Sequence, residues 1–337
     1  MFFPADRKVE LEPTPVFLDV KGEGATFISH AHADHAVKSA HTVISTPETM
    51  ALLRCRNYVK KTARHVSSTR DVAGAKVTLF NAGHIFGSSQ IKIEKNDSTF
   101  LYTGDLSLTE SLTAGKADLV ECDELLIECN FGLPRYVFPP RMDVGQQMAK
   151  WALSNEKQGA ISVIGGYSLG KAQEVIAHLN EAGITPLVPS QIASVSKCYN
   201  DNGCKRLNYV DLNTIEGQSC LKQSGFTAVF PLREVSAELG YVLREGYSTA
   251  VRLAHCSGWC LDFNSPGITG FPLSDHADFN DLTQFVEYSG AKKVHCVYGS
   301  AEQFAATLCR KGIDASPVRQ QSKKTDGQSL LTNFQVV

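Results

Sequence analysis

The sequence predicts a mixed α/β protein in which one α/β unit is inserted into another. Residues 1–135 contain mostly short apolar runs separated by turn signals, which is typical of strands. From about residue 143 onward, strand-like and helical stretches alternate, and this indicates a parallel sheet covered by helices. Beyond residue 262 the pattern of the first part returns. We therefore expect an outer domain built from 1–135 and 272–337, with an inserted domain at 136–271.

Each expected element follows from a local pattern of apolar residues. One helix is expected in the first part, at 46–56. The inserted domain should contain helices at 143–156, 171–182, 192–200 and 234–244, and strands at 160–164, 185–188, 226–230 and 249–255. A strand at 293–298 is expected to complete the outer domain.

Composition and charge limit the classes of function. The 337 residues are 43% hydrophobic and 20% charged, which suits one or two domains with a large core. A formal net charge of −2 means that nucleic-acid binding would need a local basic patch. No apolar run approaches the roughly 18 residues that span a bilayer, and the N-terminus does not resemble a signal peptide. We expect a cytoplasmic protein without membrane contact, whose ten scattered cysteines are reduced thiols.

The most specific motif is a cluster of metal-binding side chains after the apolar run 25–28. His30, His32, Asp34 and His35 fall within six residues. If the strand continues, His30 and His32 share one face, and the other two come from the following turn. Imidazole and carboxylate suit zinc, and manganese or iron less specifically. The spacing therefore predicts two adjacent ion sites, with two of these side chains for each.

Further candidate ligands follow strand-like runs in the first part, at His84, Asp105 and Glu128, and Asp19 precedes the cluster. In this order the residues resemble the metallo-β-lactamase superfamily. The segment Ser274-Asp275-His276-Ala277-Asp278 narrows the resemblance to the β-CASP nucleases. The segments 257–259, 169–173 and 131–134 are similar to those of the DNA ligase-associated exonucleases and their archaeal relatives, and the resemblance covers nearly the whole chain.

The resemblance implies a metallo-β-lactamase αββα sandwich with an inserted β-CASP domain. It also implies two divalent ions, zinc at the first site and zinc or manganese at the second. The first ion would take His30, His32 and His84, the second would take Asp34 and His35, and Asp105 would bridge the two. Two ions about 3.5–4 Å apart can hold both the attacking and the leaving oxygen of a phosphodiester.

The resemblance implies catalytic roles for two further residues, and Asp19 is a third candidate. The histidine that matches His276 acts as general acid toward the leaving 3′-oxygen, and the glutamate that matches Glu128 holds it. Asp19 is expected to accept a hydrogen bond from a ligand histidine and fix its tautomer. The alternatives are a helix-terminal role for His276 and a turn carboxylate at Asp19.

One position departs from the family pattern. RNA-cutting β-CASP enzymes place a further histidine ligand before a glycine in the last part of the chain, and DNA-cutting relatives carry valine there. Here Tyr298 aligns with that position, and a neutral phenol is a poor zinc ligand. We therefore expect the second ion to bind more weakly or to be manganese. His295 lies three residues earlier on the expected strand, so it should face the opposite side.

The segment 165–171 formally matches the phosphate loop Gly-x4-Gly-Lys of nucleotide hydrolases. Ala172 follows where a magnesium-binding hydroxyl is required, so nucleotide hydrolysis is not expected. The loop could still offer Ser168, Lys171 and backbone N–H groups to a nucleic-acid phosphate, with Tyr298 nearby. Trp259 and Phe131 could stack on bases or pack in the core, and Arg135 and Arg141 could line the substrate cleft or a solvated surface.

The sequence thus favours a metal-dependent nuclease, expected to be an exonuclease that cuts single-stranded DNA in repair beside a DNA ligase or helicase. The alternative within the class is a β-CASP ribonuclease in RNA 3′-end processing or decay. A non-catalytic nucleic-acid-binding member is a second alternative, which the complete donor set disfavours. A small-molecule hydrolase such as a glyoxalase or lactamase is disfavoured by the inserted domain. Oligomeric state and strand polarity do not follow from the residues.

Overall fold

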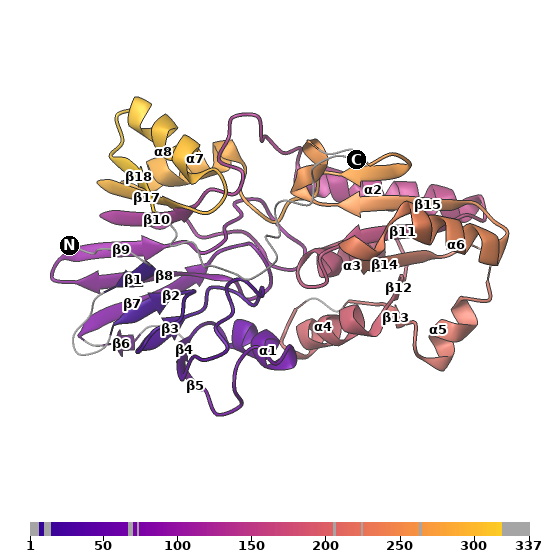
Figure 1. Cartoon of the computed structure of the whole chain (residues 1–337), viewed down its shortest axis with the longest axis horizontal. Helices are drawn as coiled ribbons and strands as arrows, with labels where there is room; N and C mark the ends of the chain where they lie inside the picture. Colours follow the sequence, from indigo (N-terminus) through magenta and orange to yellow (C-terminus); the bar gives the residue numbers. More distant parts are fainter. Residues whose placement is uncertain are drawn as a thin grey trace.

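The computed structural model describes residues 7–9, 15–66, 70–72, 74–204, 207–223, 225–262 and 265–318. Within these ranges the strands form three sheets, of five, seven and six strands. Figure 1 shows the first two sheets at one end of the molecule and the third at the other. The expectation of a mixed α/β protein is confirmed. The expected lack of a leader peptide concerns residues 1–6, which lie outside the described residues, and cytoplasmic location stays a prediction.

The five-stranded sheet is formed by the first part of the chain and has the order β1-β2-β3-β4-β5. Its strands are β1 (Lys8–Val9), β2 (Val16–Leu18), β3 (Ala25–Phe27), β4 (Thr42–Ile44) and β5 (Arg64–Val66). The seven-stranded sheet has the order β18-β17-β10-β9-β8-β7-β6. Its strands are β6 (Arg70–Val72), β7 (Ala75–Asn81), β8 (Ser89–Lys95), β9 (Ser98–Tyr102), β10 (Glu124–Glu128), β17 (Lys293–Val297) and β18 (Ala315–Pro317). The last part of the chain therefore completes a sheet that the first part begins.

A shared apolar core joins these two sheets. Buried side chains of both enter it, including Leu18 and Phe27 from one sheet and Ile91, Phe100 and Leu126 from the other. Alternate residues of a strand point to opposite faces, so each sheet can present one apolar face to its partner. On the outer face of the seven-stranded sheet, helices α7 (Phe279–Ser289) and α8 (Ala301–Arg310) pack against β10 and β17. Helix α1 (Pro47–Cys55) adjoins the five-stranded sheet.

The six-stranded sheet is parallel throughout and has the order β13-β12-β14-β11-β15-β16. Its strands are β11 (Ile161–Gly166), β12 (Leu187–Val188), β13 (Val210–Asp211), β14 (Thr227–Pro231), β15 (Val251–Cys256) and β16 (Ile268–Phe271). Every residue of β11 is buried, as expected for a strand covered on both faces. The accompanying helices are α2 (Arg141–Lys157), α3 (Lys171–Glu181), α4 (Ser190–Asp201), α5 (Ile215–Cys220) and α6 (Ala237–Tyr247), with short 3₁₀ turns η2 (Leu232–Glu234) and η3 (Gly258–Leu261). The domain boundaries at 136 and 271 stay a prediction.

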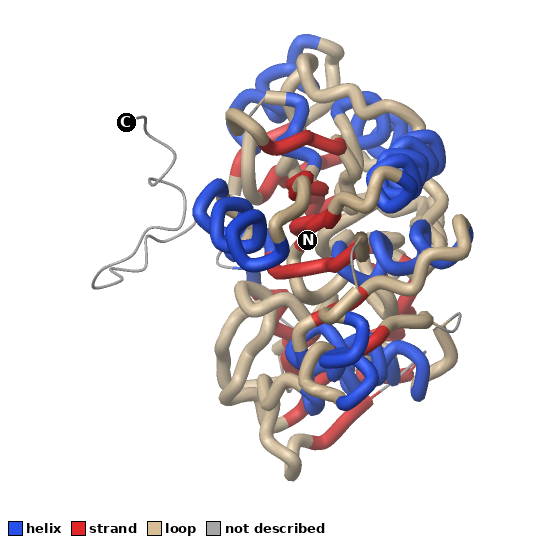
Figure 2. Tube along the Cα trace, turned by 90° about the vertical axis from the view of Figure 1, so that its right-hand side faces the viewer, coloured by secondary structure: helices blue, strands red, loops and turns tan. Residues whose placement is uncertain are grey.

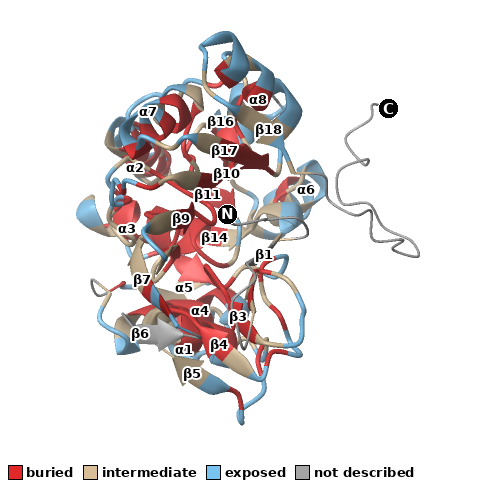
Figure 3. Cartoon of the chain, turned by 90° about the vertical axis from the view of Figure 1, so that its left-hand side faces the viewer, coloured by how far each residue is buried: buried red, intermediate tan, exposed pale blue. Residues whose placement is uncertain are grey.

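Seen from either end of the molecule, strands lie between helices, and the buried residues concentrate in the strands and in the helix faces beside them (Figures 2 and 3). No helix in the described ranges combines the length and the apolar character that crossing a bilayer requires. In a fold of this kind the strands and helices form the core, so the polar side chains of a functional site are expected in the loops where the strands end.

The structure corrects some of the expected elements. The helix expected at 234–244 begins at Ala237, because the Ser236 side chain accepts a hydrogen bond from the N–H of Leu239 and caps it. Strand β16, which pairs with β15, was not among the expected elements. Helix α7 was not predicted, although Asp278 caps its N-terminus by accepting from the N–H groups of Asn280 and Asp281.

Candidate metal centre

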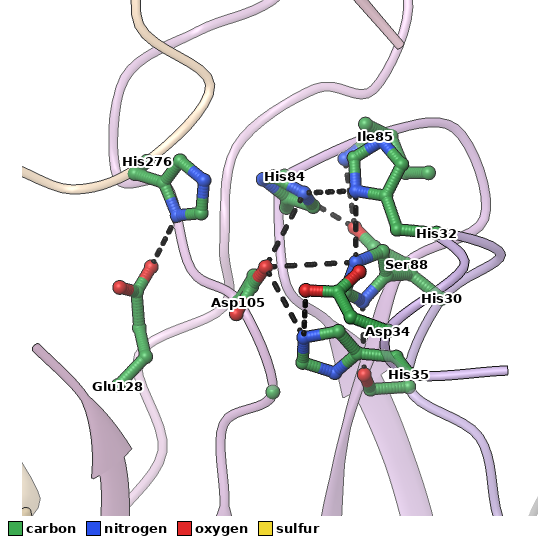
Figure 4. A network of polar contacts seen from close by, with 12 residues as sticks. His30, His32, Asp34, His35, His84, Ile85, Ser88, Asp105, Glu128 and His276 are labelled. Carbon is green, nitrogen blue, oxygen red and sulfur yellow. Dashed lines mark hydrogen bonds and ion pairs between the residues drawn. The ribbon is translucent and has the colours of Figure 1, made fainter. Parts of the chain in front are cut away.

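Six candidate ligands lie close together at one site (Figure 4). Each follows a strand: His30, His32, Asp34 and His35 follow β3, His84 follows β7, and Asp105 follows β9. Strand β3 ends at Phe27, so the strand does not continue through His32. The chain turns there instead, and the N–H of Ala36 donates to the carbonyl of His32 at 3.0 Å. A turn, rather than one face of a strand, therefore brings the histidines together.

Four donor atoms form a set with the dimensions of a zinc site. His32 Nδ1 lies 3.0 Å from His30 Nε2 and 3.1 Å from His84 Nε2. Asp105 Oδ2 lies 3.5 Å from His30 Nε2 and 3.6 Å from His84 Nε2. Ligands about 2.0–2.1 Å from a tetrahedral zinc ion are about 3.3–3.4 Å apart. These four side chains could therefore coordinate one cation with tetrahedral geometry, and their mutual distances identify them as one candidate metal group.

Asp105 also faces a second, looser group. Its Oδ2 lies 3.6 Å from His35 Nε2, and Asp34 Oδ2 lies 3.8 Å from the same nitrogen. The Asp34 side chain is 82% exposed, so this group is open to solvent on one side. The other carboxylate oxygen of Asp105 is buried and has no hydrogen-bond partner among the described residues. A buried oxygen of this kind is costly unless a cation or water satisfies it, which supports a cation at this position.

The imidazoles of the second group and of His30 are oriented through Asp19. His35 Nδ1 lies 2.8 Å from Asp19 Oδ2, and Ser29 Oγ donates to the same oxygen at 2.7 Å. Ser29 Oγ in turn lies 3.0 Å from His30 Nδ1. Each histidine can therefore donate its outer N–H and present the lone pair of Nε2 to the centre. Asp19 thus contacts His35 directly and His30 through Ser29.

The remaining two imidazoles are held by backbone carbonyls from distant segments. His84 Nδ1 lies 2.8 Å from the carbonyl oxygen of Asp275. His32 Nε2 lies 3.1 Å from the carbonyl oxygen of Leu169. An N–H that donates to a carbonyl leaves the other ring nitrogen unprotonated. His32 therefore turns Nδ1 to the centre, whereas the other three histidines turn Nε2.

The partly buried His276 and the fully buried Glu128 form a pair beside this centre. His276 Nδ1 lies 2.8 Å from Glu128 Oε1, and the N–H groups of Leu106 and Asn130 donate to the carboxylate at 3.0 and 2.9 Å. Burial alone lowers the pKa of His276, but the charge and hydrogen bond of Glu128 outweigh it and raise the pKa to about 10. The ring of His276 lies 4.5 Å from that of His84 between centroids. The pair can therefore present a protonated imidazole next to the metal group.

Tyr298 lies at the edge of the second group, with its ring 5.2 Å from that of His35 between centroids. Its hydroxyl is 3.1 Å from the hydroxyl of Tyr102 and accepts a hydrogen bond from Arg7. Burial raises the pKa of the Tyr298 phenol above its ordinary value, so the hydroxyl stays neutral. His295 Nε2 lies 3.6 Å from Glu124 Oε2, and His295 does not line the cavity at the centre. Among the described residues, no histidine therefore takes the place of Tyr298 in the second group.

A cavity of about 600 Å³ opens onto His276 and four of the candidate ligands, namely His32, Asp34, His35 and Asp105. Ser168 and Tyr298, which the sequence suggests as substrate-binding residues, line it, and so do Phe131 and Trp259. Sequence reasoning missed three further lining residues, Arg56, Tyr167 and Arg233. Tyr167 lies inside the glycine-rich loop and could have been found there. The two arginines are single basic residues without a recognisable motif.

Three cationic residues considered for the substrate cleft do not line this cavity. Lys171 is 1% exposed, and its Nζ lies 3.2 Å from Asp275 Oδ1. Arg141 is buried, with Nε 3.1 Å from Glu174 Oε1. Arg135 is exposed and lies 3.3 Å from Asp262. The assignment of Lys171 to substrate binding stays a prediction that its burial does not favour.

Comparison with known proteins identifies several relatives. A probable DNA ligase from Opitutus terrae is 33% identical over 305 residues, which are 86% of this chain and 28% of the ligase. An RNase J-like protein from Methanocaldococcus jannaschii is 26% identical over 188 residues, 48% of this chain and 45% of that protein. The DNA cross-link repair protein SNM1 of Arabidopsis thaliana is 24% identical over 321 residues, 85% of this chain and 64% of that protein. The chain thus spans between 28% and 64% of the lengths of these relatives.

Among solved structures, a protein of unknown function from Enterococcus faecalis V583 superimposes with a TM-score of 0.58. The match covers 90% of this chain and 81% of that protein at 14% sequence identity, so it shows a shared fold. No protein-family profile matches the sequence.

Proposed function

Since the chain belongs to the β-CASP nucleases of the metallo-β-lactamase fold, we propose that it hydrolyses phosphodiester bonds of single-stranded DNA as a metal-dependent exonuclease. The observation that carries the proposal is that His32 and Asp105 of the tetrahedral donor set line the same cavity as His276, which Glu128 holds. We also propose the αββα sandwich of this fold, interrupted by a β-CASP domain at 136–271. The shared core of the two sheets and the helices outside them support that architecture.

The proposed ion sites follow from the donor set. His30, His32, His84 and Asp105 would hold the first ion, and Asp34 and His35 would hold the second with Asp105 between them. Nitrogen-rich donors suit zinc at the first site, and the more exposed second site suits zinc or manganese. When bound, divalent ions would supply Lewis-acid polarisation of the phosphodiester and activation of water. Asp19 acts in this scheme by holding His35 in one tautomer.

The proposed proton donor is His276. Its pKa, raised to about 10 by the neighbouring Glu128, keeps the imidazole protonated at neutral pH. A protonated imidazole on the cavity wall can transfer its proton to the leaving 3′-oxygen as the phosphorus–oxygen bond breaks. Glu128 acts through His276, because its carboxylate is fully buried and fixes the direction of the ring.

The cavity wall supports a single-stranded substrate. Tyr167 and Trp259 line it with 47% and 36% of their surface exposed, and Arg56 and Arg233 add positive charge. Aromatic side chains stack on unpaired bases with about 1–3 kcal/mol per base, and arginines attract phosphates. Because the net charge of the chain is −2, these local groups would provide the attraction to a strand.

Tyr298 supports DNA rather than RNA as the substrate, because it occupies the position at which RNA-cutting relatives have histidine. The relative named as RNase J-like keeps a ribonuclease as the second candidate. The relative named as a probable DNA ligase supports a place beside DNA ligation, so we propose a DNA ligase as the functional partner.

The test is cleavage of one sequence supplied as single-stranded DNA and as RNA, labelled at either end, with zinc, manganese or magnesium. We expect stepwise shortening of DNA that a chelator abolishes. Cleavage of RNA alone would support the ribonuclease, and internal cuts would contradict exonuclease action. Binding without cleavage of either strand at any metal level would contradict a nuclease.

A further inference from the structure

The segment 168–171, at the start of α3, contacts one proposed ligand of the first ion directly and a second one through Asp275. The Leu169 carbonyl oxygen lies 3.1 Å from His32 Nε2, although the two residues are 137 positions apart. This contact engages the outer nitrogen of His32 and turns Nδ1 toward His30 and His84. The six-stranded sheet thus contributes a contact to the first ion site without contributing a ligand.

The same segment reaches the second imidazole through a buried ion pair. Lys171 Nζ lies 3.2 Å from Asp275 Oδ1, and both side chains are buried. The backbone carbonyl of Asp275 lies 2.8 Å from His84 Nδ1. A buried carboxylate needs its cation, because an unpaired charge in this environment is strongly unfavourable. Lys171 therefore holds the residue whose carbonyl fixes His84.

The shape of the loop allows this approach. Gly170 has a φ of +88°, and a Cβ at that position would overlap Cγ2 of Ile85, the neighbour of His84. The side chain of Gln173 accepts from the N–H of Gly170 at 2.8 Å and donates to the Ser168 carbonyl at 3.2 Å. A positive φ favours glycine, and these two hydrogen bonds fix the loop in this conformation. The loop is therefore held against the His84 turn.

We propose that the loop 168–171 is the outer support of the first ion site and that Lys171 is a positioning residue for His84. The glycine-rich motif then serves metal binding through its Leu169 carbonyl and its buried lysine, rather than by contacting a phosphate. The affinity for the first ion consequently depends on how the six-stranded sheet packs against the loops of the five- and seven-stranded sheets. This inference rests on the proposed assignment of His32 and His84 as ligands.

The test compares Lys171→Met, which removes the charge at similar length, with the conservative Lys171→Arg. Arg141→Met is the matched control, because Arg141 is also buried in an ion pair of this region but its partner Glu174 contacts none of the proposed ligands in the described part of the chain. The readouts are zinc affinity by competition with a chromophoric chelator, the absorption spectrum of the cobalt-loaded protein, and the melting temperature of the metal-stripped protein.

We expect Lys171→Met to weaken zinc binding by about 10- to 100-fold and to shift the cobalt spectrum, as loss of outer contacts of metal ligands does. Lys171→Arg should restore much of the affinity. Arg141→Met should lower the melting temperature but leave affinity and spectrum as in the wild type. Equal affinities and spectra for Lys171→Met and the wild type would overturn the inference.

The outcomes separate this inference from the proposed function. A wild-type protein that binds neither zinc nor cobalt contradicts the proposed ion site itself, whatever the variants do. If Lys171→Met does not fold, Gly170→Ala provides the same test, because its Cβ would push the loop away from Ile85. A shifted cobalt spectrum in that variant supports the inference, and an unchanged spectrum overturns it.

Discussion

Glu128 Oε1 lies 2.8 Å from His276 Nδ1, and this contact raises the pKa of His276 to about 10 against the opposing effect of burial. A histidine whose pKa is higher in the folded than in the unfolded state stabilises the fold most below its unfolded pKa of about 6.5. That stabilisation is lost as the pH rises toward 10. The pair therefore links the catalytic proposal to a measurable pH dependence of stability.

We predict that Glu128→Gln lowers the melting temperature most below pH 6.5 and progressively less toward pH 10. The amide keeps the shape of the side chain but removes the charge that favours protonated His276. Thermal unfolding of both proteins across this pH range measures the difference. Glu124→Gln is the control, since Glu124 lies on the same strand and neither it nor its partner His295 lines the cavity. A difference independent of pH would contradict the assigned interaction.

His276→Ala is expected to slow cleavage by roughly 10²- to 10⁴-fold, the usual contribution of a general acid. Both ions should stay bound, because His276 donates a proton in the proposed mechanism and is not a ligand. Single-turnover cleavage and metal analysis of the purified variant check the two statements separately. Loss of an ion in this variant would instead identify His276 as a ligand.

Removal of a first-ion ligand should abolish both binding and cleavage. His32→Ala and Asp105→Ala each delete an atom of the tetrahedral set, so we expect less metal in the purified protein and no detectable product. His65→Ala is the control, because this half-buried histidine contacts Ser45 and lies outside the candidate metal groups. Full activity in either ligand variant would refute the site assignment.

Tyr298→His is expected to tighten the second ion, because a neutral imidazole is a good ligand and a neutral phenol is not. Tyr298→Phe is the control, since it removes the hydroxyl that contacts Arg7 and Tyr102 without adding a donor. Titration with manganese or zinc, followed by DNA and RNA cleavage at each metal level, measures both effects. We also expect RNA cleavage to rise relative to DNA cleavage in the histidine variant. An unchanged second-ion affinity would show that position 298 does not serve this site.

Trp259→Ala is expected to raise KM for single-stranded DNA while changing kcat little, because a stacked base contributes to binding in the substrate and the transition state alike. Tyr241→Ala removes an exposed aromatic residue that does not line the cavity and should leave KM unchanged. Steady-state cleavage of a short oligonucleotide measures both constants. A fall in kcat with unchanged KM would place Trp259 in the chemical step instead.

Much of the fold was predictable because the pattern is local. The strand–helix alternation of the inserted part predicted helix α3 and strand β11 to within one or two residues of their observed bounds. Helices α7 and α8 were not predicted, although Asp278 caps the N-terminus of α7. The turn at His32 was also missed, because the hydrogen bond that ends the extended chain forms only once the loop closes.

The residue order alone determined the chemical type of the candidate site, because four donor side chains within six residues are a property of the chain itself. Only the tertiary structure decided which ring nitrogen of each histidine faces the centre and which group contacts the other ring nitrogen. The contacts that settle this for His32 and His84 come from Leu169 and Asp275, 137 and 191 residues away. Tertiary packing likewise buried Lys171 against Asp275 instead of exposing it to a phosphate. A local motif specifies donor atoms, whereas their orientation depends on carbonyls and charges that folding brings from other segments.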